Sequence, residues 1–364
     1  MTITPSGPLR GPDLRRTGTH PDFWYPLAWS NELKAGETLA RRFAGDPIVL
    51  FRGASGKVFA LEDRCAHRQV PLSLGVVEGE TLKCGYHGWT YNCAGKCVDV
   101  PYLGRERLPN GVRSYPTREV DGLIFVFPGN AARAAERAPM SLGSKSDSRY
   151  KTRRLNREVA CHYTFMHENL FDMNHQFLHR SLMGTIKATC LGRRQGEDWC
   201  EVDYTFTRTA GSQSLGEAAI LNLVGGEEIE GTADLMTIRT GYPYQNLKVW
   251  VNGSEPVLDV WLGYTPLDRE QRTNRTFGYL SVKKPKIPGL IHLAWPFITW
   301  FTEGIFTQDK HIVEQEQKAH DEQGADWNNE VFPAVRDLRA VLLRCGVAMD
   351  GALDSPLPSI AAAE

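Results

Sequence analysis

The sequence predicts an α+β fold, with an all-β domain first and a mixed domain after it. Three observations support this fold class. Short β-rich runs separated by turn residues extend from about residue 38 to residue 130. Longer runs with strand character lie between residues 153 and 282, and two helical segments, 306–323 and 331–343, follow them. Strands followed by a separate group of helices are typical of α+β proteins.

Length and composition limit the classes of protein to consider. The chain has 364 residues, which predicts two domains. Its net charge of −1 gives no general attraction to nucleic acid or to an anionic membrane. No apolar run approaches the ~20 residues that span a bilayer, and residues 1–20 lack the apolar segment of a secretory signal. Eight cysteines in a chain of this length do not form a disulfide framework, so we expect reduced thiols and a cytoplasmic location.

The amino-terminal part of the chain contains an arm and the start of the first domain. Residues 1–37 are expected to form this arm and an aromatic lead-in, because residues 22–30 are dense in aromatic side chains. The first clear strand signals are the runs 47–52 and 57–61, which flank Gly53-Ala-Ser-Gly56. Two β-rich runs joined by such a turn predict a hairpin.

A further strand signal at residues 122–127 closes the first domain, which we place at residues 38–130. The Ala- and Arg-rich residues 131–140 are expected to form a linker or a short helix. A second domain is predicted for residues 141–350, and residues 351–364 form a polar tail that is expected to fray.

The second domain is expected to combine an antiparallel sheet with helices. Residues 161–178 have helical spacing, and the two helical segments named above close the domain. The predicted strands are residues 153–159, 199–208, 235–240, 247–251, 257–264 and 276–282.

Two Cys-His pairs form the most distinctive motif of the chain. Cys65-Ala-His67 is followed, after sixteen residues, by Cys84-Gly-Tyr-His87 and then Gly-Trp. Two thiolates and two imidazoles can bind Zn²⁺ or a [2Fe–2S] cluster of Rieske type, in which two histidines replace two cysteines on one iron. Zinc fingers usually pair Cys with Cys and His with His along the chain. The mixed pairs therefore favour the cluster. A zinc site of Cys84 with the nearby Cys93 and Cys97 is a weaker alternative.

A second group of possible metal ligands lies in the predicted helix at 161–178. Asp172, His175 and His179 would fall at i, i+3 and i+7, close to one face. Two imidazoles and a carboxylate form the facial triad of non-haem Fe(II) oxygenases, which leaves coordination positions open. The third ligand must come from elsewhere in the chain, and Asp309 is the best candidate. Its rivals are Glu303, Glu314 and Glu316.

Together these motifs resemble those of the catalytic (α) subunits of Rieske non-haem iron oxygenases. The resemblance covers nearly the whole chain and implies a helix-grip catalytic domain. It implies that Cys65 and Cys84 ligate one cluster iron, that His67 and His87 ligate the other, and that His175, His179 and Asp309 hold the mononuclear Fe(II). It further implies that Asp172 bridges two subunits and that Asn169 lies near the iron. The family often has four residues between its two histidine ligands, whereas this chain has three.

The resemblance also implies partners. No G-x-G-x-x-G motif in a strand–turn–helix setting points to NAD or flavin binding by this chain. Electrons are then expected from a separate reductase or ferredoxin, with NAD(P)H as the remote donor. A head-to-tail homotrimer would bring the cluster of one subunit beside the iron of the next. Asp172 would accept hydrogen bonds from His175 and from His67 or His87 of the partner subunit, which predicts half-buried cluster loops.

The favoured activity is monooxygenation of a small organic substrate with O₂, either hydroxylation or oxidative demethylation. The spacing from Asn169 to Asp172 resembles that of the monooxygenase and demethylase members, and the length suits members built of α subunits alone. Three alternatives are an aromatic-ring cis-dihydroxylating dioxygenase, a Rieske electron-transfer protein without oxygenase activity and a zinc-stabilised binding module.

Overall fold

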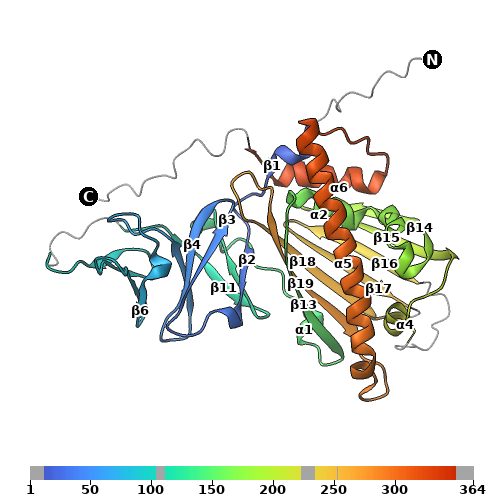
Figure 1. The fold of residues 1–364 in the computed structure, drawn as a ribbon, viewed down its shortest axis with the longest axis horizontal. Helices are drawn as coiled ribbons and strands as arrows, with labels where there is room; N and C mark the ends of the chain where they lie inside the picture. Colours follow the sequence, from blue (N-terminus) through green and yellow to red (C-terminus); the bar gives the residue numbers. More distant parts are fainter. Residues whose placement is uncertain (1–11, 104–110, 223–233, 252, 350–364) are drawn as a thin grey trace. The chain divides into compact units, whose positions relative to one another are not determined.

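The computed structural model describes residues 12–103, 111–222, 234–251 and 253–349 (Figure 1). The predicted tail, 351–364, lies outside these residues. Two compact units are present. We call Thr19–Ser141 with Thr265–Gln271 the β unit. The mixed unit contains the described residues up to Gly18, together with Leu142–Tyr264 and Arg272–Met349.

Three antiparallel sheets build the β unit. The predicted hairpin is confirmed, because β4 pairs with β5 and places Ile48 opposite Glu62. Residues Ile48–Phe51 are fully buried, as expected for a continuous apolar run at the centre of a sheet. The strand orders are β10-β5-β4-β3, β11-β12-β2 and β6-β7-β8-β9. Their bounds are β2 Tyr25–Trp29, β3 Thr38–Phe43, β4 Asp46–Arg52, β5 Val58–Glu62, β6 Val76–Glu78, β7 Thr81–Lys83, β8 Thr90–Asn92, β9 Cys97–Asp99, β10 Ser114–Tyr115, β11 Thr117–Val120 and β12 Leu123–Val126.

A seven-stranded antiparallel sheet forms the centre of the mixed unit, in the order β13-β19-β18-β17-β16-β15-β14. Every strand predicted for the second domain is present in it. Its bounds are β13 Tyr150–Val159, β14 Thr185–Gln195, β15 Trp199–Ala210, β16 Leu235–Gly241, β17 Tyr244–Trp250, β18 Leu258–Pro266 and β19 Asn274–Lys283. The sequence analysis missed β14, because this edge strand is polar and mostly exposed and so lacks a buried alternating face.

The long helix α5, Leu290–Gln323, crosses one face of this sheet (Figure 1). The prediction that a helix begins at residue 306 was wrong by four turns. Pro296 lies inside the helix, in its second turn, and discouraged a helical assignment of this stretch. Burial of Ile291, Ala294 and Ile298 on the inner face holds this part of the helix against the unit.

The other helices of the unit are shorter. The helix α6, Pro333–Cys345, starts with proline in its first turn, as helices often do, and it confirms the second predicted closing helix. Two further short helices are α1, Gly143–Ser146, and α4, Leu215–Leu221. Along the described residues, no helix is long and apolar enough to cross a membrane.

The segment 161–178 is broken, so the prediction of one continuous helix was wrong. The helix α2, Tyr163–Phe171, ends at Asp172, whose backbone is extended. A 3₁₀ helix, η5 (Met173–Phe177), and α3 (Arg180–Met183) follow it. The Asp172 side chain accepts a hydrogen bond from the Asn174 N–H at 2.9 Å and thereby caps η5. Asp172, His175 and His179 therefore do not share the face of a single helix.

The amino-terminal residues contribute to the mixed unit. Thr17–Gly18 (β1) pairs with Val347–Ala348 (β20), and Leu14 is fully buried. Conversely, the Thr265 hydroxyl donates a hydrogen bond to the Pro26 carbonyl within the β unit, at 2.7 Å. Segments far apart in sequence thus complete each unit. The predicted domain limits, which assumed contiguous segments, stay predictions.

His167 on α2 allows a prediction about pH. This side chain is fully buried against the Tyr264 ring, and burial lowers its pKa from 6.5 to about 3. The folded state keeps His167 neutral, so the unfolded state binds an extra proton below pH 6.5 and stability falls as the pH falls. By pH 5 this linkage costs about 2 kcal/mol. We expect Tm to fall less between pH 8 and pH 5 in His167→Gln than in the wild type.

The matched control is His311→Gln, at an exposed position of α5. This variant should keep the pH dependence of the wild type. Equal losses of Tm in wild type and His167→Gln would show that His167 does not contribute to acid destabilisation.

Candidate metal centres and active site

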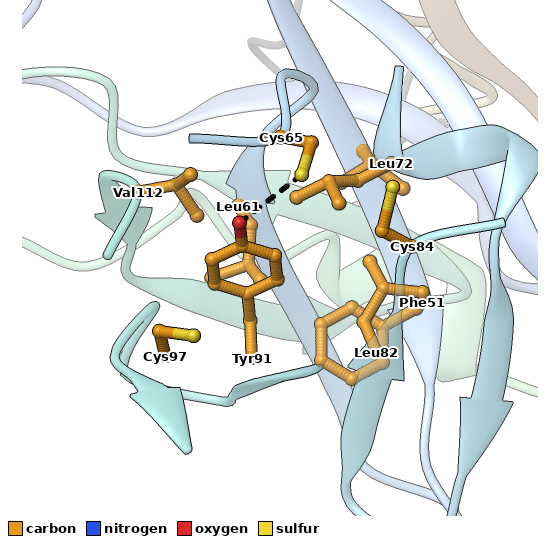
Figure 2. Packing of buried hydrophobic residues seen from close by; sticks show 10 residues of the cluster. Phe51, Leu61, Cys65, Leu72, Leu82, Cys84, Tyr91, Cys97 and Val112 are labelled. Atoms are coloured by element: carbon orange, nitrogen blue, oxygen red, sulfur yellow. Dashed lines mark hydrogen bonds between the residues drawn. The ribbon is translucent and has the colours of Figure 1, made fainter. Parts of the chain in front are cut away.

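The two Cys-His pairs lie on neighbouring loops of the β unit. Cys65 follows β5, Cys84 follows β7, and both thiols are buried at the same end of an apolar cluster that includes Leu72 and Leu82 (Figure 2). Burial raises the pKa of the Cys84 thiol, and the neighbouring Cys65 side chain raises it further. Two adjacent buried thiols become thiolates only when a cation lies beside them. This arrangement therefore fits a metal-bound pair.

The imidazoles lie at the tips of the same loops. The ring centroids of His67 and His87 are 4.6 Å apart, and His67 stacks on Trp89 at 4.7 Å. His67 Nδ1 is buried without a hydrogen-bond partner, which fits a lone pair directed at a metal. Partial desolvation lowers the pKa of His87, and the charges of His67 and Arg68 lower it further, so the ligand form of the imidazole is favoured.

Glycine allows the two ligand loops to approach each other closely. A Cβ atom on Gly85 would lie 2.6 Å from the Leu74 carbonyl oxygen, and one on Gly75 would lie 2.2 Å from the Lys83 carbonyl oxygen. Both distances are shorter than any real carbon–oxygen contact, so only glycine fits at these two positions.

The spacing of these ligand atoms distinguishes a cluster from a single ion. A tetrahedral zinc ion holds its ligands at about 2.0–2.3 Å, so they lie within about 4 Å of one another. In a search of the described residues, Cys65, His67, Cys84 and His87 do not form a group of three or more ligand atoms within 4.8 Å, and neither do Cys84, Cys93 and Cys97. This separation does not support either zinc alternative. It fits two irons, with thiolates on one and imidazoles on the other.

A second candidate centre lies in the mixed unit, between η5 and α5. The ligand atoms of His175, His179 and Asp309 lie within 4.8 Å of one another. The Asp309 Oδ1 atom is 3.2 Å from His179 Nε2 and 3.8 Å from His175 Nε2. Two imidazoles and one carboxylate in this arrangement match the donor set of a facial triad.

Hydrogen bonds orient the three candidate ligands. His175 Nδ1 lies 2.6 Å from the main-chain oxygen of Asp172, and His179 Nδ1 lies 2.8 Å from Gln308 Oε1. Because these oxygens accept from Nδ1–H, each imidazole presents an unprotonated Nε2 to the shared point. The Asn169 amide donates to Asp309 Oδ1 at 3.1 Å. Every ligand is thus held by a partner outside the triad.

Electrostatics favour an anionic Asp309. Burial by itself raises the pKa of this carboxyl, but the neighbouring His179 and His175 side chains and the Asn169 amide lower the pKa below its ordinary value. The three rival carboxylates do not join the triad. Glu303 binds Arg153 and Arg157, Glu314 binds Lys310, and Glu316 is exposed. The structure therefore brings together the favoured set of the sequence analysis.

A cavity of about 360 Å³ opens beside the triad. Its wall includes His175, His179 and Asp309, together with apolar side chains from β14, β15, β17, β18 and α5. A cavity of this size can hold a small organic molecule next to the open positions of a metal ion. The arrangement is suited to oxidative chemistry on a bound substrate.

Comparisons with known proteins agree with this geometry. Residues 23–116 match the family described as Rieske [2Fe-2S] domain, and residues 159–335 match the vanillate O-demethylase oxygenase C-terminal domain. A 4beta-methylsterol monooxygenase of Methylococcus capsulatus is 30% identical over 365 residues, which cover 96% of this chain and 94% of that protein. The chain belongs to the Rieske non-haem iron oxygenases.

Other members of this oxygenase family resemble parts of the chain. The oxygenase component of dicamba O-demethylase from Stenotrophomonas maltophilia is 37% identical over 160 residues, which cover 43% of this chain and 47% of that protein. The crystal structure of dicamba monooxygenase bound to dicamba has a TM-score of 0.70 at 23% identity, over 89% of this chain and 97% of that one. This likeness confirms the α+β fold with a Rieske domain and a catalytic domain.

Membership in the family confirms the predicted enzyme class, an O₂-dependent oxidoreductase with NAD(P)H as the general electron donor. The alternative of an electron-transfer protein is not supported, because the match extends over the catalytic domain. Several relatives are named as components or subunits of monooxygenase or demethylase systems.

One predicted interaction of this oxygenase differs from the observed one. The sequence analysis expected the Asp172 carboxylate to bind His175, but His175 Nδ1 meets the main-chain oxygen of Asp172. The carboxylate caps η5 instead, since a backbone break at Asp172 turns it toward Asn174. Sequence reasoning also missed Gln308 and Tyr91. No motif spacing points to these two residues, because only the folded chain places them beside the candidate ligands.

Tyr91 is expected to tune the Rieske cluster. Its hydroxyl oxygen accepts a hydrogen bond from the Ala66 N–H at 3.0 Å and lies 3.2 Å from Cys65 Sγ (Figure 2). Its proton is thereby directed at the sulfur, and a hydrogen bond to a ligand sulfur stabilises the reduced cluster. A bond of about 1 kcal/mol corresponds to about 40 mV for one electron. We expect Tyr91→Phe to lower the reduction potential by about that amount.

Protein-film voltammetry measures this shift directly. The control is Tyr115→Phe, at a buried tyrosine of the same unit whose ring packs against the Arg113 guanidinium. An unchanged potential in Tyr91→Phe would rule out the hydrogen bond.

Proposed function

We propose that this chain is the terminal oxygenase of a multi-component system and hydroxylates or oxidatively demethylates a small organic substrate. The observation that carries the proposal is the triad of His175, His179 and Asp309 at the wall of an apolar cavity. We assign these three residues as the ligands of a mononuclear Fe(II). When bound, this iron supplies O₂ activation and the Rieske cluster supplies electrons one at a time.

Residues of the chain itself prepare this chemistry. Gln308 and the Asp172 carbonyl hold the imidazoles with Nε2 directed at the ion, and Asn169 holds Asp309. Asn169 is thus a positioning residue. The apolar wall excludes water and places the substrate carbon beside the open coordination positions. In the β unit, we assign Cys65 and Cys84 to one cluster iron and His67 and His87 to the other.

We further propose a head-to-tail homotrimer that accepts electrons from a separate reductase or ferredoxin. Arg68 is exposed beside His87, which is itself exposed in the single chain. Asp172 lies close to the triad, and its side chain caps η5. Glu316 and Glu330 lie near it, and burial, with a smaller contribution from Asp172, raises the pKa of both acids. The positive Arg68 and the Asp172 carboxylate are complementary in charge, which supports contact between the cluster of one subunit and the iron site of the next. A cytoplasmic location stays a prediction.

Metal analysis and a single-turnover experiment test the proposed function. The loaded protein should contain three irons and two acid-labile sulfides per chain, one iron more than a [2Fe–2S] cluster provides. Mixing the chemically reduced protein with O₂ and a substrate should reoxidise the cluster and yield one product. Formaldehyde would identify demethylation, an alcohol would identify hydroxylation, and a cis-diol would identify the dioxygenase alternative. Two irons per chain without oxygenated product would contradict the proposal.

A further inference from the structure

The substrate cavity has an apolar wall drawn from several elements. Ile186 on β14, Phe206 on β15, Leu247 on β17 and Val260 on β18 contribute from the sheet. Phe301 and Ile305 contribute from α5. Such a wall offers dispersion and burial of apolar surface. The polar residues Gln176, Gln213, Asn222 and Asp234 also line the cavity, but none of them is cationic.

The cationic side chain at this wall is already neutralised. Among the lining residues that the structure describes, Arg208 is the one arginine or lysine. It forms an ion pair with Glu217, which also lines the cavity. Glu217 is buried, so its charge is held beside the guanidinium and is not free to turn to solvent. A carboxylate substrate that reached Arg208 Nη1, which is buried without a hydrogen-bond partner, would place a second anion beside Glu217, so that two buried carboxylates would share one positive charge.

From these contacts we infer that the cavity takes a neutral, bulky, largely aliphatic molecule, not an anionic aromatic acid. The inference rests on the proposed function and names the substrate class of the same site. An uncharged molecule packs against the apolar wall of the cavity and leaves the Arg208–Glu217 pair intact. The pair then disfavours anions, because a second buried carboxylate beside Glu217 would have no positive charge of its own.

Calorimetric titration of the holoenzyme tests this inference without turnover. The probes are progesterone, a neutral tetracycle, and dicamba, an aromatic carboxylate. Progesterone should bind at least tenfold more tightly than dicamba. In Glu217→Gln, which frees the Arg208 charge, the affinity for dicamba should rise at least tenfold, whereas the affinity for progesterone should change little.

Two outcomes would overturn the inference. One is dicamba binding as tightly as progesterone to the wild type, and the other is an unchanged dicamba affinity in Glu217→Gln that melts like the wild type. Because binding is measured apart from iron content and product formation, these outcomes leave the proposed oxygenase activity standing. A holoenzyme that prefers progesterone but forms no oxygenated product would instead contradict only the proposed oxygenase activity.

The outer face of α5 carries a second, independent inference. From Leu290 to Thr302 the helix contains no Asp, Glu, Lys or Arg. Its inner face is buried, yet Leu293, Phe297 and Trp300, which recur at i, i+4 and i+7 on the other face, are 74%, 50% and 62% exposed. A surface helix normally turns polar side chains outward. We call these three residues the outer apolar face.

Positive charges adjoin the outer apolar face. Lys284 and Lys286 are exposed just before the helix, next to Ile287, which is also exposed. The nearby carboxylates already have cationic partners, because Glu303 binds Arg153 and Arg157, and Glu255 binds Arg149 and Lys283. Exposed Leu, Phe and Trp beside lysines are typical of helices that lie in a membrane interface.

We propose that the outer apolar face docks on an anionic lipid surface. The lysines match anionic headgroups, and the exposed apolar side chains match the acyl boundary. The same helix walls the cavity with Phe301 and Ile305, one turn from Trp300, so a lipophilic substrate would pass from the lipid to the cavity over a short distance. Surface docking needs no spanning helix. It would revise the expectation from net charge that no membrane takes part.

Co-sedimentation of the full-length holoenzyme with vesicles tests the docking. The protein should sediment with phosphatidylcholine vesicles that contain 30% phosphatidylglycerol, and it should sediment less with vesicles of phosphatidylcholine alone. The reason is that each lysine near an anionic surface contributes about 1 kcal/mol of binding free energy. The double variant Phe297→Glu/Trp300→Glu should bind at least tenfold more weakly. The control Val331→Glu, at an exposed apolar residue away from α5, should bind like the wild type.

Light scattering of the same proteins distinguishes lipid docking from contact with a second copy of the chain. A wild type that stays in the supernatant with both vesicles would overturn the proposal. A double variant that loses its oligomeric state would assign the outer apolar face to a second copy of the chain. Retained binding in a folded double variant would exclude this face from lipid contact.

Discussion

Replacing Asp309 with alanine should remove the mononuclear iron and leave the Rieske cluster in place. Loss of a residue that only supports a ligand costs about 10–100-fold in metal affinity or activity, so loss of the ligand should cost at least about a thousandfold in turnover. Asp309 is the anionic member of the triad, and its oxygen lies nearest His179. The visible absorbance of the cluster should be unchanged, since its ligands lie in the β unit.

Iron analysis with absorbance spectroscopy measures both metals in one sample. The variant should fall from three irons per chain to the two that a [2Fe–2S] cluster holds. Glu314→Gln is the matched control, because Glu314 lies on the same helix but binds Lys310. This control should keep all its iron. Three irons in a folded Asp309→Ala protein would remove Asp309 from the ligand set.

Replacing Asp172 with asparagine should nearly abolish turnover while both metals stay bound. The Asp172 side chain caps η5, the element that carries His175. Asparagine can cap the helix equally well, so the position of His175 should be kept, but the negative charge is lost. If this charge links the cluster of the partner subunit to the iron site, electron delivery should slow by at least about a hundredfold.

Comparison with Asp172→Ala separates the two roles of the residue. Alanine removes both the charge and the cap, so it should cost about 1 kcal/mol of additional stability and weaken iron binding. Stopped-flow reoxidation of the reduced cluster reports electron transfer, and metal analysis reports the site. Wild-type reoxidation in Asp172→Asn, together with slow reoxidation only in Asp172→Ala, would assign Asp172 to capping and exclude the bridging role.

The two Cys-His pairs could be singled out in the sequence because their signal is local. Cys65 and His67 lie on one loop, Cys84 and His87 on another, and a metal-binding loop must supply its donors within a few residues. His175 and His179 were chosen as candidate ligands for the same reason, although the segment is not the continuous helix that suggested them. The prediction of Asp309 depended on the family resemblance, since no local spacing connects it to the histidines.

Long-range packing explains most of the errors. The stretch Leu290–Ile305 contains Pro296 and is apolar on two faces, so its periodicity does not identify a helix until the sheet covers one face. The edge strand β14 is held by its hydrogen-bond ladder with β15, and a polar sequence does not indicate such pairing. The break at Asp172 results from a capping hydrogen bond that competes with helix continuation.

The sequence by itself determined the order of the domains, the β-rich runs and the residues that can bind metal. These properties follow from side-chain chemistry and from spacings of a few residues. Only the tertiary structure decided that Gln308, Asn169 and the Asp172 carbonyl orient the ligands, that Glu217 neutralises Arg208 in the cavity, and that the outer apolar face of α5 stays uncovered in the chain. The contacts of Asn169 with Asp309 and of His179 with Gln308 join residues 140 and 129 positions apart, and only the packed chain determines which groups meet.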